Sequence, residues 1–308
     1  MKKYLLAFLF VFLISCTTLN QNTTTPKSED TDAIVKDVIS SRNVASVVTQ
    51  VTEADINHIG CAPEEIDENG RCVAKIEDNN AAIFGSGELK VTTETLPLGY
   101  IARPATNGSY PGVVMIHEWW GLNDNIKYMA RVLASKGYVV YAIDLYNGNV
   151  ADTSDNAMKY MQNGLSHQDQ MTATMKEAVE YLRTLPEVTK VGSLGWCFGG
   201  GQSLQLALSG EALDATVIYY GTLTSDIDQL SVITWPVLGI FAQNDSSITP
   251  DKVENFENAI TELGIQNQVV IYPNVRHAFA NPSGTSFAPE ETKDAWNKTL
   301  AFLDKNLK

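Results

Sequence analysis

A cysteine in a glycine-rich segment is the first residue of this sequence that could do chemistry. Cys197 lies within GSLGWCFGGG, residues 192–201, where an apolar run typical of a strand passes directly into a helical pattern. Glycines on both sides of a nucleophile permit a tight strand-to-helix turn in which a β-carbon would meet neighbouring backbone. The N-terminus of the following helix would also favour a thiolate. The alternative is an ordinary buried cysteine, since cysteine is among the most commonly buried residue types.

Two later residues, an aspartate and a histidine, could complete a nucleophilic site with Cys197. Asp245 follows the apolar run 236–242, and His277, the only histidine after Cys197, follows the apolar run 269–272. A thiol needs a base to take its proton, and the base needs a partner that holds its orientation. The order nucleophile, acid, histidine, each after a strand, is that of an α/β-hydrolase. Taken singly, the aspartate or the histidine could be an ordinary loop residue.

The elements that must position these residues form a regular alternation from about residue 88 onward. Short runs rich in Val and Ile alternate with segments of helical period, which predicts an α/β fold: an α/β-hydrolase with a mainly parallel central sheet and helices on both faces. Ligand sites of such sheets lie beyond the carboxyl ends of the strands. The expected strands are 89–96, 98–103, 112–117, 138–143, 190–196, 215–220, 237–242 and 268–273, and the expected helices include 126–133, 171–182, 253–263 and 296–303. For the third helix we expect Thr249 as the N-cap, Pro250 as the first helical residue and Gly264 as the stop.

The loop after the expected strand 112–117 carries a further acidic residue. Glu118 is followed by Trp119 and Trp120, and in α/β-hydrolases this loop supplies the second backbone N–H of the oxyanion hole. Glu118 could equally be a solvated loop carboxylate, and we interpret His117 as structural.

Taken together, these segments resemble the dienelactone hydrolase family over roughly residues 88–308. The matching motifs occur in family order: HEWWGL at 117–122, DLY at 144–146, GWCFGG at 195–200, YYG at 219–221, QND at 243–245 and HAF at 277–279. The resemblance implies a cysteine hydrolase that needs no cofactor or metal, with Cys197 as nucleophile, His277 as base and acid, and Asp245 orienting the imidazole. It also implies that Glu118 helps to generate the thiolate and that the backbone N–H groups of Trp119 and Phe198 form the oxyanion hole.

The sequence departs from this family where a substrate carboxylate would be bound. Family members that take such a lactone use one arginine shortly after DLY and one a few residues past the histidine. This chain has Asn147-Gly148-Asn149 and Ala280-Asn281-Pro282 there. A neutral amide cannot replace a guanidinium paired with a carboxylate, so we expect a small-molecule ester or lactone other than dienelactone. Aromatic residues that could bind an apolar group are Trp119, Trp120, Trp196, Phe198, Tyr219, Tyr220 and Phe279.

The N-terminus predicts export and lipid anchoring. Lys2 and Lys3 precede a short apolar stretch that ends in Leu-Ile-Ser-Cys at residues 13–16, which is too short to span a bilayer and is typical of a signal peptide. The ending resembles a bacterial lipobox, so we expect residues 1–15 to be removed and Cys16 to carry the lipid. The alternative is a plain signal peptide. We therefore expect a lipid-anchored protein of the bacterial cell envelope, at the periplasmic face or the cell surface, with residues 16–32 as a polar tether.

Residues 33–87 form an expected N-terminal extension with weak patterning. Cys61 and Cys72 flank a turn-like segment, and an exported chain tends to oxidise such a pair, which predicts a disulfide. A zinc site is the rival interpretation, but two thiols with His58 are an incomplete ligand set.

The composition limits the partners. With 36 acidic and 22 basic residues, the formal charge is −14, which argues against nucleic-acid binding. Two other functions stay open: hydrolysis of thioester or peptide-like acyl groups, and a non-catalytic ligand-binding lipoprotein on the same fold. The sequence does not indicate an oligomeric state.

Overall fold

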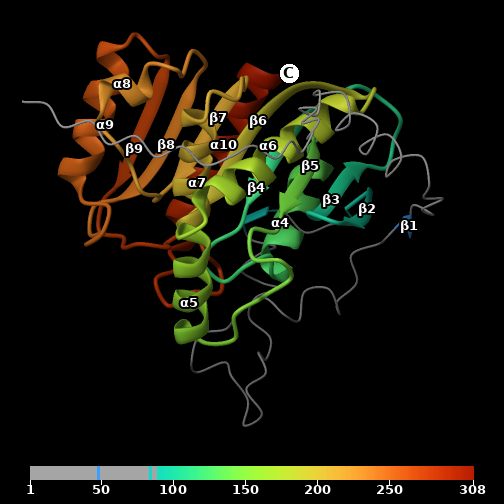
Figure 1. The fold of residues 1–308 in the computed structure, drawn as a ribbon, viewed down its shortest axis with the longest axis horizontal. Coiled ribbons are helices and arrows are strands. Elements are labelled where there is room, and N and C mark those ends of the chain that lie inside the picture. The colour runs from blue at the N-terminus through green and yellow to red at the C-terminus, as the bar shows by residue number, and fades with distance from the viewer. Residues whose placement is uncertain (1–46, 49–82, 85–88) are drawn as a thin grey trace, which may run out of the picture. The chain divides into compact units, whose positions relative to one another are not determined.

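The computed structural model describes residues 47–48, 83–84 and 89–308, whose centre is a sheet of nine strands (Figure 1). The spatial order is β1-β2-β3-β5-β4-β6-β7-β8-β9. Strands from β5 through β9 pair in parallel, while β1, β2, β3 and β5 are joined by antiparallel pairs. The predicted, mainly parallel sheet is therefore confirmed. The strands are β1 (Val47–Val48), β2 (Val91–Leu96), β3 (Gly99–Pro104), β4 (Tyr110–Ile116), β5 (Val139–Ile143), β6 (Val188–Trp196), β7 (Ala215–Tyr219), β8 (Val237–Ala242) and β9 (Asn267–Tyr272).

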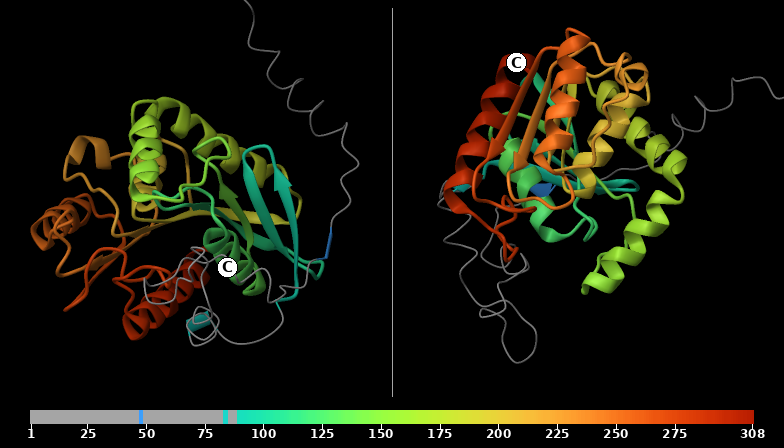
Figure 2. Two further views of the ribbon diagram at one scale, coloured as in Figure 1. Left: turned by 90° about the horizontal axis from the view of Figure 1, so that it is seen from below. Right: turned by 90° about the vertical axis from the view of Figure 1, so that its left-hand side faces the viewer.

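Helices cover both faces of the sheet, as the alternating pattern predicts (Figure 2). Apolar residues of α4 and α10 pack in one core cluster with one face, and those of α6, α7 and α9 pack in a second cluster with the other. The helices are α4 (Asp124–Ser135), α5 (Ser154–Leu165), α6 (Gln168–Thr184), α7 (Phe198–Leu208), α8 (Ile227–Leu230), α9 (Pro250–Glu262) and α10 (Pro289–Leu307). The α5 and α8 helices are not among the helices expected from the sequence.

The observed strands begin and end within two residues of the expected ones, and one of the three two-residue shifts has a physical cause. β4 begins at Tyr110 rather than at residue 112, and its register with β6 shifts between Tyr110 and Gly112. Pro111 stands at this irregularity, where the N–H that proline lacks is not needed by the ladder. In α9, Pro250 occupies the first turn as expected, but the Thr249 side chain makes no capping hydrogen bond. Gly264 follows α9 at φ +72°, which agrees with its expected role as the stop.

Two short segments from the expected N-terminal extension join the main body. β1 pairs antiparallel with β2. Ile83 and Phe84 are buried in the cluster that includes α4 and α10, and the Phe84 ring lies edge-on to Tyr128 and Trp296, with centroids at 6.3 and 5.5 Å. These segments belong to the same compact unit as the sheet. The expected signal peptide 1–15, lipidated Cys16, tether 16–32 and disulfide Cys61–Cys72 lie outside the described residues.

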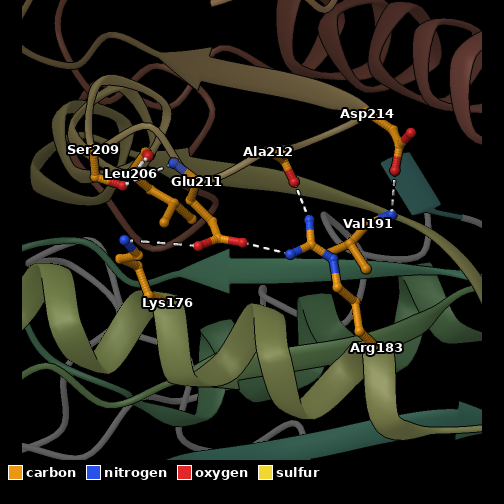
Figure 3. Close-up of polar contacts among 8 residues, drawn as sticks. All are labelled: Lys176, Arg183, Val191, Leu206, Ser209, Glu211, Ala212 and Asp214. Carbon is orange, nitrogen blue, oxygen red and sulfur yellow. Dashed lines mark hydrogen bonds and ion pairs between the residues drawn. The ribbon is translucent and has the colours of Figure 1, made fainter. Parts of the chain in front are cut away.

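A polar cluster ties α6 to the loop between α7 and β7 (Figure 3). The nearly buried carboxylate of Glu211 accepts a 2.5 Å hydrogen bond from Arg183 and lies 3.9 Å from the Lys176 ammonium. Arg183 also donates to the carbonyl of Ala212. Two residues on, Asp214 accepts a 2.9 Å hydrogen bond from the backbone N–H of Val191 in β6. The cluster thus ties both α6 and β6 to the loop between α7 and β7.

Among the residues with described positions, no helix has the length and apolar character that a membrane crossing requires.

Candidate active site

Cys197 occupies the sharp turn between β6 and α7. Its backbone has φ 55° and ψ −118°, a conformation that is strained for a residue with a β-carbon. The turn is held by hydrogen bonds from the Cys197 N–H to the Tyr219 carbonyl (3.0 Å) and from the Gly201 N–H to the Cys197 carbonyl (3.1 Å). The side chain is partly exposed. The segment therefore presents its sulfur at the carboxyl end of the sheet and at the N-terminus of a helix.

The glycines around Cys197 are required by close backbone approach. A β-carbon on Gly195 would come within 3.0 Å of the Gly199 carbonyl, and one on Gly199 would come equally close to the carbonyls of Ile116 and His117. These neighbours are backbone atoms and cannot rotate away. The glycines thus let α7 begin directly against the end of β4, which brings the turn beside the Glu118 loop.

The structure brings Cys197, His277 and Asp245 together in a hydrogen-bonded chain. The His277 Nε2 atom lies 3.2 Å from the Cys197 sulfur, and its Nδ1 atom lies 2.6 Å from Asp245 Oδ2. Asp245 is buried, and its other oxygen accepts hydrogen bonds from the backbone N–H groups of Ser247 (2.8 Å) and Ile248 (3.0 Å). The carboxylate is thus fixed by the first turn after β8, and it can in turn fix the ring of His277.

The hydrogen bonds and charges among Cys197, His277 and Asp245 favour a protonated imidazole beside an ionised carboxylate. Burial by itself would lower the pKa of His277, but the hydrogen bonds to Asp245 and Cys197 outweigh it and raise that pKa to about 10. Burial by itself would raise the pKa of Asp245, but the hydrogen bonds from His277, Ile248 and Ser247 bring it below its usual value. Both shifts have the same cause, because each partner stabilises the charged form of the other.

Glu118 is buried in the same site, at the end of β4. Its carboxylate accepts a 2.6 Å hydrogen bond from Asn281 Nδ2. Burial raises the pKa of Glu118 to about 7, although the nearby His277 and the Asn281 hydrogen bond act to lower it. The solvated-loop interpretation of Glu118 is therefore wrong, because the loop folds its side chain inward.

The expected oxyanion-hole residues lie at the same cavity. Trp119 and Phe198 line it together with Cys197 and His277. The loop that holds Trp119 is fixed by the buried ring of His117, which donates from Nδ1 to the Glu118 carbonyl (2.6 Å) and accepts at Nε2 from the Leu145 N–H (3.1 Å). With both ring nitrogens engaged in backbone contacts, His117 has the structural role expected for it.

The cavity has a volume of about 860 Å³, and the described residues that line it include no arginine that could pair with a substrate carboxylate. No Lys is among those lining residues either. Arg276, which directly precedes His277, is exposed and does not line the cavity. Asn147, Gly148 and Asn149 do not line it, whereas Asn281 does. Four of the aromatic candidates line the cavity, namely Trp119, Trp120, Phe198 and Tyr220, and the other three, Trp196, Tyr219 and Phe279, are buried in the core.

No group of three or more His, Cys, Asp or Glu side chains in the described part of the chain is arranged to hold a metal ion.

Sequence reasoning missed two features of the site. From the sequence, Asn281 stands out only because it lies where family members have an arginine. In the structure it is the hydrogen-bond partner of Glu118. Sequence reasoning also overlooked α5, although Met158, Met161 and Leu165 have the i, i+3, i+7 spacing that could have revealed a helix with an apolar face.

A sequence model of the "Dienelactone hydrolase family" matches residues 98–307. "Protein usf" of Aquifex pyrophilus is 35% identical over 219 residues, which cover 68% of this chain and 93% of that protein. A protein of Aquifex aeolicus with the provisional name carboxymethylenebutenolidase is 32% identical over 220 residues, covering 68% of this chain and 94% of its own length.

Solved structures show the same fold. The structure "m3DLH" has a TM-score of 0.62 with 24% identity, covering 73% of this chain and 95% of its own. A dienelactone hydrolase-like promiscuous phosphotriesterase from metagenomic libraries has a TM-score of 0.61 with 23% identity and the same coverage. The predicted α/β-hydrolase fold is thereby confirmed.

Proposed function

This chain belongs to the dienelactone hydrolase family, and we propose that it hydrolyses carboxylic esters or lactones through an acyl-cysteine intermediate, with Cys197, His277 and Asp245 as its triad. The observation that supports this most directly is the continuous contact from the Cys197 sulfur to His277 Nε2 and from Nδ1 to Asp245. The A. aeolicus relative, whose provisional name denotes a lactone hydrolase, supports the substrate class.

In the proposed reaction, Cys197 reacts as a thiolate paired with the His277 imidazolium, the form that the raised pKa of His277 favours, and the sulfur attacks the substrate carbonyl carbon. The negative charge that develops on the carbonyl oxygen is stabilised by the backbone N–H groups of Trp119 and Phe198. His277 then returns its proton to the leaving alkoxide as the tetrahedral intermediate collapses to a thioester. Water, deprotonated by His277, attacks that thioester and restores the free thiol.

The role proposed for Glu118 is to help ionise the thiol when substrate arrives. Its carboxyl group is buried beside this chain of residues and has a pKa of about 7, so it can change protonation near neutral pH. Catalytic acids and bases commonly have pKa values near the working pH.

The decisive assay compares the wild type with Cys197→Ala on p-nitrophenyl acetate and a panel of neutral lactones. We expect activity in the wild type and its loss in the variant, with mass spectrometry of quenched wild-type protein showing the acyl group on the peptide that contains Cys197. Equal rates for the two proteins would exclude the proposal. Rapid alkylation of native Cys197 by iodoacetamide separates a catalytic thiol from that of a non-catalytic binding protein, because only an activated thiol reacts fast.

We also propose that the protein is held at the bacterial cell envelope by lipid on Cys16, and that Cys61 and Cys72 form a disulfide. Both proposals depend on the sequence alone. Processing that is blocked by globomycin, and a mature chain that begins at Cys16, would support the anchor, whereas a different mature N-terminus would exclude it. Non-reducing peptide mapping tests the Cys61–Cys72 bond.

A further inference from the structure

The α5 helix presents an apolar stripe to the catalytic cavity. Met158, Met161 and Leu165 line the cavity that contains Cys197 and His277. Their spacing places them along one face of α5. The residues that attach the helix to the body are small: Ala157 and Gly164 are its buried positions. In Figure 1, α5 projects away from the sheet. Met161 packs partly against the second core cluster, whereas Met158 and Leu165 are exposed.

Two residues of this stripe are unusually exposed for large apolar side chains. Met158 is 41% exposed and Leu165 is 48% exposed. Other exposed large apolar residues in the described part of the chain, such as Ile227 and Val232, do not line the cavity. When a ligand covers exposed apolar surface at a binding cavity, the burial of that surface stabilises the complex.

Two polar side chains of the cavity lining, Gln168 and Gln202, satisfy each other's hydrogen bonds. Gln168 Nε2 donates to Gln202 Oε1 at 2.7 Å, and Gln202 Nε2 donates back to Gln168 Oε1 at 3.1 Å. Gln202 is buried. Because the two amides pair reciprocally, neither amide requires a polar group from a ligand. The α5 side of the cavity therefore offers apolar surface without a free charge.

We propose that Met158, Met161 and Leu165 form a subsite for an uncharged alkyl or aryl group of the substrate. This inference rests on the proposed ester hydrolysis and specifies its substrate class as neutral esters with an extended apolar group. The cavity is about 860 Å³, near the upper end of the roughly 300–1,000 Å³ typical of small-molecule sites, which is far more than an acetyl group fills. The absence of Lys and Arg from the described lining favours a neutral group over a carboxylate.

The test compares the wild type with the double variant Met158→Gln/Leu165→Gln on esters of increasing length. One series varies the acyl group (p-nitrophenyl acetate, butyrate and hexanoate), and the other varies the alcohol (ethyl, butyl and hexyl acetate). For the wild type we expect kcat/KM to rise up to about fourfold per added methylene in at least one series. The series that rises identifies which side of the ester occupies the subsite. In the double variant the rise should fall below about twofold per methylene.

The matched control is Ile227→Gln/Val232→Gln, which replaces exposed apolar residues that do not line the cavity. It should retain the wild-type dependence on chain length. A flat wild-type dependence in both series, or an equal dependence in wild type and α5 variant, would overturn the subsite.

A second measurement separates this inference from the proposed function. Hexyl acetate is titrated into Cys197→Ala protein with and without the α5 substitutions, and binding is followed by the fluorescence of Trp119 and Trp120, which line the cavity. If the wild type hydrolyses no ester but the α5 substitutions still weaken binding, the subsite stands and the hydrolytic proposal fails. Equal binding by both proteins would overturn the subsite.

Discussion

The buried carboxylate of Glu118 accepts a 2.6 Å hydrogen bond from the side-chain amide of Asn281, a residue 163 positions further along the chain. The sequence resemblance places a substrate-binding arginine near this point of the family pattern. In this chain a neutral amide contacts Glu118 instead, so the pair brings one fewer positive charge to the cavity. Burial raises the pKa of Glu118 to about 7, and the hydrogen bond from Asn281 offsets only part of that rise.

Replacing Asn281 should change the pH at which the enzyme becomes active. The Asn281 hydrogen bond lowers the pKa of Glu118, so Asn281→Ala should raise that pKa above about 7. If the ionised carboxylate is needed to form the thiolate, the acid limb of kcat/KM lies near pH 7 in the wild type and moves to higher pH in Asn281→Ala. The measurement is the pH profile of kcat/KM on p-nitrophenyl acetate.

Glu118→Gln provides the control, because it removes the titrating group. In that background Asn281→Ala should no longer shift the acid limb, and Glu118→Gln itself should lower kcat by about 10²–10⁴-fold. An acid limb that is the same in all variants would show that Glu118 does not take part.

Asp245 should set the alkaline limit of activity. Its hydrogen bond and charge help to raise the pKa of His277 to about 10, and the protonated imidazole is the group that would give a proton to the leaving alkoxide. Asp245→Asn should therefore lower the pKa of His277 and move the alkaline limb of kcat to lower pH. NMR titration of the His277 imidazole measures that pKa directly. An unchanged His277 titration in Asp245→Asn would contradict the contact seen here.

The raised pKa of His277 should also make the stability of the folded protein depend on pH. The pKa of His277 is raised above its ordinary 6.5 by folding, so the protonated ring stabilises the folded state fully below pH 6.5. That contribution is lost as the pH rises toward 10. The free energy of unfolding should thus fall over this window by more in the wild type than in His277→Gln, as measured by urea unfolding at a series of pH values. An equal fall in both proteins would show that His277 is not the group responsible.

The fold and the order of the site residues follow from local pattern. The β6 and α7 elements around Cys197 are predictable because the glycine spacing, the apolar run and the helical pattern all indicate the same turn. Asp245 and His277 could be placed at the site because parallel strands end at one edge of the sheet, so residues after β8 and β9 must lie near Cys197.

The hydrogen-bond partner of Glu118 and the position of α5 at the cavity could not be predicted from local sequence pattern. Whether Glu118 points inward depends on the burial of the loop and on Asn281, which is distant in sequence, and no local pattern couples the two. The α5 helix has a recognisable apolar spacing, but its polar residues and Gly164 weaken the signal. That its stripe lines the cavity follows from tertiary packing, which residue spacing does not reveal.

Gly199 should be intolerant of any side chain. A β-carbon there would lie within 3.0 Å of the carbonyls of Ile116 and His117, which are backbone atoms that cannot move without displacing β4. We expect Gly199→Ala to lower the free energy of unfolding by at least about 3 kcal/mol, as overpacking against rigid neighbours does. Gly284→Ala, where the new atom would meet its nearest neighbours at 3.5 Å or more, should stay within about 0.5 kcal/mol of the wild type. Urea unfolding measures both, and similar losses would contradict the geometry.

The Glu211 cluster allows two cations to be compared against one carboxylate. Arg183 donates to Glu211 at 2.5 Å and also to the Ala212 carbonyl, whereas Lys176 lies 3.9 Å from Glu211 (Figure 3). The two cationic side chains are similarly exposed, at 41% and 39%. Arg183→Met leaves a nearly buried carboxylate without its close donor, so we expect a loss of about 1.5–3 kcal/mol in the free energy of unfolding. Lys176→Met removes a longer ion pair that includes no hydrogen bond, and it should cost less than about 0.5 kcal/mol.

Salt distinguishes the two contributions further. The Lys176 contribution should vanish in 1 M NaCl, where the screening length falls to about 3 Å. The Arg183 contribution should largely persist, because it includes a short hydrogen bond to Glu211 and a second hydrogen bond to the Ala212 carbonyl, neither of which depends on long-range charge attraction. Urea unfolding of the wild type and both variants at low and high salt measures these differences. Equal losses for Arg183→Met and Lys176→Met, or losses that vanish together in salt, would show that the cluster is only a surface charge pair and does not anchor α6 to the segment before β7.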